Sequence, residues 1–432
     1  MTSPHAAPPL PGQSGPDAGL PFGNSILALA DALAAISEQA DALTVTYATA
    51  THRAAAEWLQ RRMLACHFDE VGIDAVGNVV GRYHARESGA AQLLTGSHFD
   101  TVRNGGRYDG RLGILAPMEV VAALAAAGRR LAFDIVVIGF ADEEGVRFGT
   151  TFLGSSAVIG AFDTAVLERR DADGITMREA MQTAGLAPDA IACAMLTDRP
   201  TIGFVEIHIE QGPVLLDENL ALGVVSAING AVRMMFEIDG AAGHAGTTPM
   251  NGRRDAACAA AEATLLIERR CSAEPALVGT VGMLEVPAGS VNVIPAQARF
   301  SLDLRAPDDA QRDRALADIL AGIDALCRAR GVRWRSEEIM RAPATAADPG
   351  LRGLWRDAVT GIGLPLRELP SGAGHDAIRM AGACAQAMLF VRCGAGGISH
   401  SPEETLDAAD ADAAARAFDL FLQLLEQRMR GT

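Results

Sequence analysis

His98 and Asp109 are the residues of this chain whose types and spacing most directly suggest chemistry. The apolar run 93–95 predicts a short buried strand that ends near His98, and Asp109 follows across a Gly-rich loop. A histidine at a strand end and a carboxylate across a loop can form half of a metal centre. Asp100 could accept the proton of the His98 ring nitrogen that does not bind metal. The alternative interpretation is a polar loop whose histidine is held by ordinary hydrogen bonds.

Further candidate ligands stand near the ends of other predicted strands. These are Glu144 after strand 135–140, His208 within strand 203–209, and His400 in a Gly-rich loop after strand 387–393. Because ligands of open α/β sheets gather at the carboxyl ends of strands, we expect these groups to converge. The predicted ligand set is therefore three imidazoles and two carboxylates: His98, Asp109, Glu144, His208 and His400.

Five ligands are too many for one tetrahedral zinc ion with an open position, but they suit two divalent ions bridged by Asp109. We expect Zn²⁺ or Mn²⁺, with Co²⁺ as a substitute. Glu143 stands beside the ligand Glu144 and is predicted to act as general base toward a water shared by the ions. The alternative interpretation of residues 142–144 is a solvated charged run. The buried strand before this run and the glycine after it favour a site.

A second group of candidates lies in turn-rich segments. His244 could donate a hydrogen bond to a developing oxyanion, and Asn292 places an amide at a strand edge. Arg305 ends a predicted strand with a guanidinium that can hold a carboxylate through two hydrogen bonds. His375 lies on a Gly-rich loop. Taken singly, each of these residues is more often structural.

The elements that must position these residues predict an α/β fold. Strands and helices alternate through residues 24–220 and 339–432, which predicts one catalytic domain with a mostly parallel sheet flanked by helices. Residues 221–338 instead follow the order β-α-β-β-α-β of the ferredoxin-like arrangement, which predicts an inserted second domain. Among the individual elements, we expect one helix over 26–43 and one continuous strand over 224–238.

The composition limits the kinds of molecule that the protein is expected to bind and the cellular compartment in which we expect it. The net charge of −16 argues against nucleic acid and against anionic membrane surfaces. No apolar run reaches the length of a membrane span. Seven dispersed cysteines without a Cys-x-x-Cys pair suit the reducing cytoplasm. Residues 1–23 are rich in Pro, Gly and Ala and lack the features of a secretory signal, so we expect a disordered tail.

Several motifs in combination resemble those of a known family. They are Gly96 to Gly110, Glu143 to Phe148, His208 to Gly212, His244 to Met250, Val291 to Pro295 and Ser371 to Asp376. Together they resemble the dinuclear-metal amidohydrolases related to carboxypeptidases and acetylornithine deacetylase. The similarity is strongest to the branch that cleaves ureido groups, and it covers nearly the whole chain from residue 25 onward.

The resemblance implies the same five metal ligands, with Glu143 as the general base. It implies that substrate is held by Gln211, His244, Asn292, Arg305 and His375, with Arg305 on the substrate carboxylate and His244 near the attacked carbonyl. It also implies a homodimer joined through the inserted domain, which acts as a lid, so that His244 can serve the partner subunit's site. A cis peptide bond after Asp109 is a further implied feature.

The expected reaction is the hydrolysis of a terminal ureido group in a small substrate that bears a carboxylate, with release of ammonia and carbon dioxide. The motifs look most like those of allantoate amidohydrolases, which belong to purine catabolism. An N-carbamoyl-L-amino-acid hydrolase or β-ureidopropionase shares every residue named above and is the alternative. A peptidase or deacylase of the wider superfamily and a non-enzymatic binding protein are two further alternatives. The complete ligand set with Glu143 disfavours the last, because binding alone needs no base.

Overall fold

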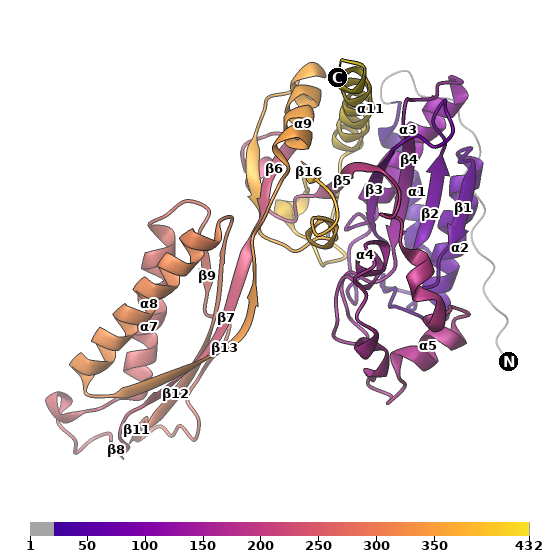
Figure 1. Ribbon diagram of the computed structural model, residues 1–432. Coiled ribbons are helices and arrows are strands. Elements are labelled where there is room, and N and C mark those ends of the chain that lie inside the picture. The colour runs from indigo at the N-terminus through magenta and orange to yellow at the C-terminus, as the bar shows by residue number, and fades with distance from the viewer. Residues whose placement is uncertain (1–20, 432) are drawn as a thin grey trace. The chain divides into compact units, whose positions relative to one another are not determined.

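The computed structural model in Figure 1 describes residues 21–431 of the chain. These residues form two compact units. The first contains residues 21–226, 347–369 and 375–431, and the second contains residues 227–346 and 370–374. Most of the predicted tail lies outside the described residues, and helix α1 (Gly23–Ala34) already begins at the last residue of that tail. The lid and dimerisation roles expected for 221–338 stay predictions.

A nine-stranded sheet runs through the first unit in the order β1-β2-β4-β3-β5-β16-β6-β14, with β15 paired to β6. Its four central strands are parallel, and the flanking strands are antiparallel. The predicted α/β class is confirmed, with the parallel part confined to the centre of the sheet. The strands are β1 (Glu70–Ile73), β2 (Val79–Tyr83), β3 (Gln92–His98), β4 (Asp134–Phe140), β5 (Thr201–Ile209), β6 (Leu222–Ile228), β14 (Thr345–Ala346), β15 (Glu368–Ser371) and β16 (Gln386–Val391).

The central strands form because their residues can be buried on both faces. Every residue of β3, β4 and β16 is buried, and β4 is a continuous Val/Ile-rich run, as expected for a covered parallel sheet. The main core joins these strands to five helices: α1, α2 (Ala50–Ala65), α3 (Leu112–Ala126), α9 (Pro349–Gly361) and α11 (Ala408–Arg430). A separate core cluster packs around α4 (Leu153–Val158) and α5 (Met177–Thr183). The short helices α6 (Val214–Asp217) and α10 (Ala377–Met380) complete this unit.

The second unit has an antiparallel sheet covered on one side by two helices, α7 (Ala256–Ser272) and α8 (Asp309–Arg330), as Figure 1 shows. The strand order is β10-β12-β7-β13, with β9 also paired to β12. The strands are β7 (Gly230–Asp239), β9 (Val278–Thr280), β10 (Leu284–Glu285), β12 (Gln297–Ala306) and β13 (Arg333–Ala342). A separate ribbon pairs β8 (Gly243–His244) with β11 (Val293–Ile294).

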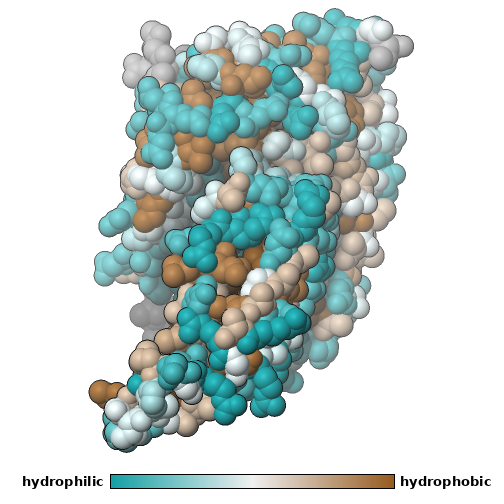
Figure 2. Space-filling model, turned by 90° about the vertical axis from the view of Figure 1, so that its left-hand side faces the viewer, coloured by the Kyte–Doolittle hydropathy of each residue, from teal (hydrophilic) through white to brown (hydrophobic). Residues whose placement is uncertain are grey.

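Alternation of buried and exposed residues along β7 and β12 gives this second sheet one apolar face and one polar face. The apolar face packs on α7 and α8, whose outer surfaces are largely hydrophilic in Figure 2. Among the described residues, no helix is both long and apolar enough to cross a membrane.

Two predicted elements were wrong in extent. The helix expected over 26–43 ends at Ala34, because the Ser37 hydroxyl bonds to the Ala42 carbonyl and accepts the Thr44 N–H (3.0 Å) and so stabilises a turn. The strand expected over 224–238 is two strands, β6 and β7, separated at Asn229. The Asn229 N–H bonds to the Ser371 carbonyl (2.9 Å) at the end of β15, and from Gly230 onward the chain pairs with β12 in the second sheet.

Candidate metal centre

The parallel strands deliver the predicted ligands to one place in the first unit. The ligand atoms of His98, Asp109 and His208 lie within 4.8 Å of one another, and those of Asp109, Glu144 and His400 form a second such group. Both groups contain Asp109. Since β3, β4, β5 and β16 run in the same direction, their carboxyl ends meet at one edge of the sheet, which explains the convergence.

The two oxygens of Asp109 face different histidines. His98 Nε2 and His208 Nε2 lie 3.7 Å and 3.3 Å from Oδ1, whereas His400 Nε2 lies 3.2 Å from Oδ2. His400 Nε2 is also 3.3 Å from Glu144 Oε1. The carboxylate thus divides the cluster into two groups of ligands.

The electrostatics of the cluster centre on Asp109. Burial alone would raise the pKa of Asp109, but hydrogen bonds from His208, His400 and His98 outweigh it and hold the pKa well below its usual range. Burial likewise opposes the charged form of His98, yet Asp100 and Asp109 raise its pKa well above the ordinary value. A carboxylate ringed by imidazoles that favour positive charge is an environment suited to a cation.

The orientation of the buried rings also fits divalent cations. His98 Nδ1 lies 3.0 Å from the Asp100 carbonyl, and His208 Nδ1 lies 2.8 Å from the Ile209 carbonyl. Because a carbonyl can accept only from a protonated nitrogen, each ring keeps a proton on Nδ1 and directs Nε2 toward Asp109, so that a cation could take the place of the Nε2 proton. Gly110 allows this arrangement, since it has a φ of +67° and a Cβ there would lie 2.5 Å from the His98 ring.

Asp100 contacts more than the His98 ring. The Asp100 carboxylate lies 3.5 Å from His98 Nδ1, whereas the Asp100 backbone carbonyl lies closer to that nitrogen, at 3.0 Å. The same carboxylate accepts the backbone N–H groups of Glu143 and Glu144 at 3.1 Å and 3.2 Å. Asp100 therefore connects the loop after β3 to the acidic segment after β4.

Glu143 is buried beside the cluster, and one of its carboxylate oxygens lies within 4.8 Å of ligand atoms of His98 and Glu144. Burial raises its pKa well above the ordinary value, and the neighbouring carboxylates of Asp376 and Glu144 add to this effect although His98 opposes it. A raised pKa makes a carboxylate a stronger base, which suits general acid–base work.

Sequence reasoning missed Glu404 and Ser399. The Glu404 carboxylate is buried and accepts the backbone N–H groups of Tyr108 (2.7 Å) and Asp109 (3.2 Å). The Ser399 hydroxyl lies 2.8 Å from Asp109 Oδ2 and 3.1 Å from Glu404 Oε2. These contacts tie the segment that carries His400 to the loop that carries Asp109. The only sequence signal was an acidic residue shortly after a candidate ligand, which is too common to single out.

Gln211 and His375, expected to hold substrate, lie at the cluster itself. Gln211 Nε2 donates to both oxygens of Asp109, at 3.1 Å and 3.0 Å. The His375 ring centre is 4.5 Å from that of His208, and burial together with the charge of His208 lowers the pKa of His375 well below its ordinary value. The cis peptide bond implied after Asp109 is not present, since all peptide bonds among residues 21–431 are trans.

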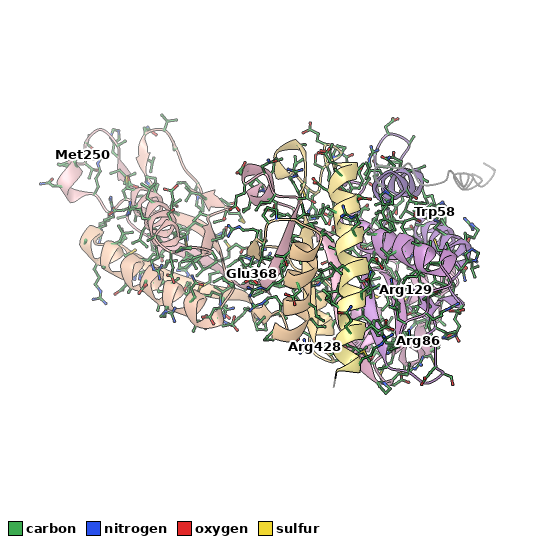
Figure 3. All side chains as sticks on the ribbon, turned by 90° about the horizontal axis from the view of Figure 1, so that it is seen from above. Trp58, Arg86, Arg129, Met250, Glu368 and Arg428 are labelled. Atoms are coloured by element: carbon green, nitrogen blue, oxygen red, sulfur yellow. The ribbon has the colours of Figure 1, made fainter. Side chains whose placement is uncertain are left out.

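The other three expected substrate residues belong to the second unit. His244 is exposed on β8, opposite Val293, and the carbonyl of the neighbouring Asn292 accepts the Ala245 N–H (3.0 Å). Arg305, at the end of β12, binds the Asp303 carboxylate through Nε (2.7 Å) and Nη2 (2.9 Å). Met250, labelled in Figure 3, projects at one end of this unit near the His244 segment and is 77% exposed.

The fold and the cluster of acids and histidines are those of a hydrolase that acts on C–N bonds. The chain belongs to peptidase family M20/M25/M40, whose model matches residues 94–426.

Individual relatives extend the match over most of the chain. An N-carbamoyl-L-amino acid amidohydrolase from Geobacillus stearothermophilus is 39% identical over 79% of this chain and 84% of its own length. An allantoate deiminase from Arabidopsis thaliana is 38% identical over 83% of this chain and 73% of its own length. A crystal structure of an amidase of the hydantoinase/carbamoylase family from Burkholderia multivorans is similar with a TM-score of 0.87 and 32% identity, covering 93% of this chain and 97% of that one.

Proposed function

We propose that this protein hydrolyses the terminal ureido C–N bond of allantoate, as part of purine catabolism, giving ureidoglycine, ammonia and carbon dioxide, with ureidoglycolate formed when ureidoglycine loses a second ammonia to water. The observation that carries the proposal is the convergence of four other candidate ligands on Asp109 beside the buried Glu143. The relative named allantoate deiminase supports the choice of substrate.

We propose two divalent ions per subunit, Zn²⁺ or Mn²⁺ with Co²⁺ as a substitute. His98 and His208 would hold one ion, and Glu144 and His400 the other, with Asp109 between them. The support is that the two oxygens of Asp109 face these different groups. Imidazole and carboxylate ligands suit these metals. When bound, such ions polarise a carbonyl and lower the pKa of a water molecule.

The side chains of the chain itself supply the remaining chemistry. Glu143 accepts a proton from the attacking water and delivers it to the leaving nitrogen, as its raised pKa favours. Asp100 holds the backbone of Glu143 and so fixes the base relative to His98. His244 donates to the carbonyl oxygen, Arg305 binds the substrate carboxylate, and Asn292, Gln211 and His375 orient the substrate.

An N-carbamoyl-L-amino-acid hydrolase, or a β-ureidopropionase, is the second candidate. It is favoured by the 39% identical relative named N-carbamoyl-L-amino acid amidohydrolase. Both candidate substrates carry a ureido group and a carboxylate, so the same residues serve either one.

We also propose a cytoplasmic homodimer joined through the second unit. Exposed hydrophobic side chains gather on that unit and would be covered by a partner: Met250, Met283, Leu284, Val286, Val291 and Val293. All seven cysteines are free thiols, as in proteins of a reducing compartment. In such a dimer, His244 would serve the partner subunit's site. A monomer in solution, measured by light scattering, would contradict this assembly.

The deciding experiment measures ammonia release by metal-loaded protein from allantoate and from N-carbamoyl-L-alanine. We expect a higher kcat/KM for allantoate. The reverse order would select the second candidate. Release from neither compound, with two metal ions bound per chain, would overturn the ureido assignment.

A further inference from the structure

Arg305 does not stand free at the end of β12. Its Nε and Nη2 groups donate to the two oxygens of Asp303 at 2.7 Å and 2.9 Å, and its Nη1 group donates to the Gly372 carbonyl at 2.7 Å. Asp303 and Arg305 are two residues apart on one strand, so both side chains emerge on the same polar face of the sheet. The buried Leu302 and Leu304 alternate with them and face the helices.

The neighbouring strands leave room for this pair. Arg305 lies opposite the small residue Ala231 on β7, and Asp303 lies opposite Arg233, whose Nε donates to Asp303 Oδ2 at 2.9 Å. Burial opposes ionisation of Asp303, but the hydrogen bonds from Arg305 and Arg233 outweigh it and lower the pKa of this carboxyl. Asp303 is therefore a charged group held between two arginines.

The donors of Arg305 can be counted. A guanidinium has five N–H groups, and three are used by Asp303 and Gly372. One N–H on Nη1 and one on Nη2 remain, and within residues 21–431 they meet no acceptor. Two N–H groups on neighbouring nitrogens of a planar fork match the two oxygens of a carboxylate. The Arg305 side chain is 31% exposed, so an anion can reach it.

We propose that Asp303 is a positioning residue that fixes the Arg305 guanidinium so that its two remaining N–H groups select a substrate with a carboxylate. This inference rests on the proposed function, because it assumes that Arg305 meets the substrate. The Asp303 carboxylate holds the planar Arg305 guanidinium through Nε and Nη2, and the Gly372 carbonyl holds it through Nη1. The consequence is selectivity for an anionic ureido compound over a neutral one of the same size.

Removal of the Asp303 charge distinguishes positioning from simple neutralisation. If Asp303 only weakened the positive charge of Arg305, the D303N variant would bind a carboxylate more tightly, by Coulomb's law. If Asp303 positions Arg305, the same variant binds a carboxylate more weakly. The two roles therefore predict changes of opposite sign.

The test measures dissociation constants by calorimetry for N-carbamoyl-L-alanine and for N-carbamoyl-L-alaninamide, which has a neutral carboxamide. Metal-loaded protein carrying E143Q serves as the parent, so that turnover does not consume the ligand. We expect the parent to prefer the carboxylate. Adding D303N should weaken carboxylate binding roughly 10-fold, the size of one lost charge-assisted hydrogen bond, and leave carboxamide binding unchanged.

The matched control is R233Q in the same parent. It removes the other ion pair of Asp303 on the same sheet face but leaves the contacts of Arg305, so carboxylate binding should stay near the parent value. Thermal unfolding of each variant checks the fold. Unchanged or tighter carboxylate binding in D303N, an equal loss in R233Q, or a parent without carboxylate preference would overturn the inference. The failure of the proposed function is a separate result, namely the absence of ureido turnover by wild-type protein.

Discussion

The candidate metal cluster of the first unit and the proposed substrate residues of the second unit are built in opposite ways. His98, Asp109 and His208 are buried, stand at or near the ends of parallel strands, and are held by backbone carbonyls and N–H groups. His244 and Asn292 are exposed on a two-stranded ribbon with few side-chain partners. The candidate metal ligands are therefore fixed by the core of the fold, whereas most of the residues proposed to bind substrate depend on local contacts.

Removal of metal is expected to cause the largest loss of activity, and it tests the buried cluster of the first unit. Dialysis against a chelator should reduce ureidase activity to background, because no other group of the cluster can polarise the carbonyl. Added Zn²⁺, Mn²⁺ or Co²⁺ should restore it, and far-ultraviolet circular dichroism should show that the sheet persists. Full activity in protein with no metal by mass spectrometry would refute the metal centre.

The E143Q variant of the same cluster separates the binding of metal from proton transfer during the reaction. The amide cannot accept a proton, so kcat should fall by about 10²–10⁴-fold. Because Glu143 is outside the predicted ligand set, the metal content should equal that of wild type. If kcat persists at the wild-type level, Glu143 is not the base.

The H244A variant probes the exposed region. Loss of one donor to a developing oxyanion typically lowers kcat by about 10²–10³-fold. The His244 side chain is exposed, so the melting temperature and metal content should not change. A fall in melting temperature of several degrees would show instead that His244 has a structural role.

The E404Q variant tests whether the Glu404 carboxylate holds the loop that carries Asp109 in place. Loss of the carboxylate that accepts the Tyr108 and Asp109 N–H groups should weaken metal binding about 10–100-fold, measured by competition with a chromogenic chelator. The neighbouring E403Q variant is the matched control, because Glu403 is exposed. Equal metal affinity in both variants would remove Glu404 from the support of the site.

The smallest expected effect is on stability. Burial, followed by the charge of Glu206, raises the pKa of Asp376 to about 8, so the folded protein keeps a proton that the unfolded chain releases above pH 4. The folded state therefore binds more protons between these values, and stability falls as pH rises, by up to about 1.4 kcal/mol per pH unit. In metal-free protein, D376N should make this slope shallower between pH 6 and pH 8 in urea unfolding. An identical slope in wild type and variant would contradict the assignment.

The sequence was enough to predict the parts of the fold that are marked by apolar runs typical of buried strands. Burial of β4 on both faces and the parallel direction of β3 and β5 could be predicted from apolar runs, and convergence of the five candidate ligands followed from that direction. Glu404 could not be found in this way, because its role comes from backbone N–H groups almost three hundred residues earlier in the chain. The division of 224–238 into β6 and β7 was missed because apolar residues stand on both sides of Asn229-Gly230, although this pair is a common turn signal and β6 ends just before it. Asp303 was visible in the i, i+2 pattern with Arg305, but only the folded strand shows how the carboxylate holds the fork.

The short segment 370–374 has a consequence for protein engineering. The chain passes between the two units four times, since this segment belongs to the second unit although it is remote from 227–346 in sequence. A second unit excised as 227–346 alone would lack the Ser371 carbonyl that binds Asn229 and the Gly372 carbonyl that binds Arg305. If Arg305 selects the substrate as we propose, grafting substrate preference from one relative to another requires both pieces to be exchanged together. A chimaera that transfers only residues 227–346 would contain Arg305 without the matching Gly372 carbonyl that holds it.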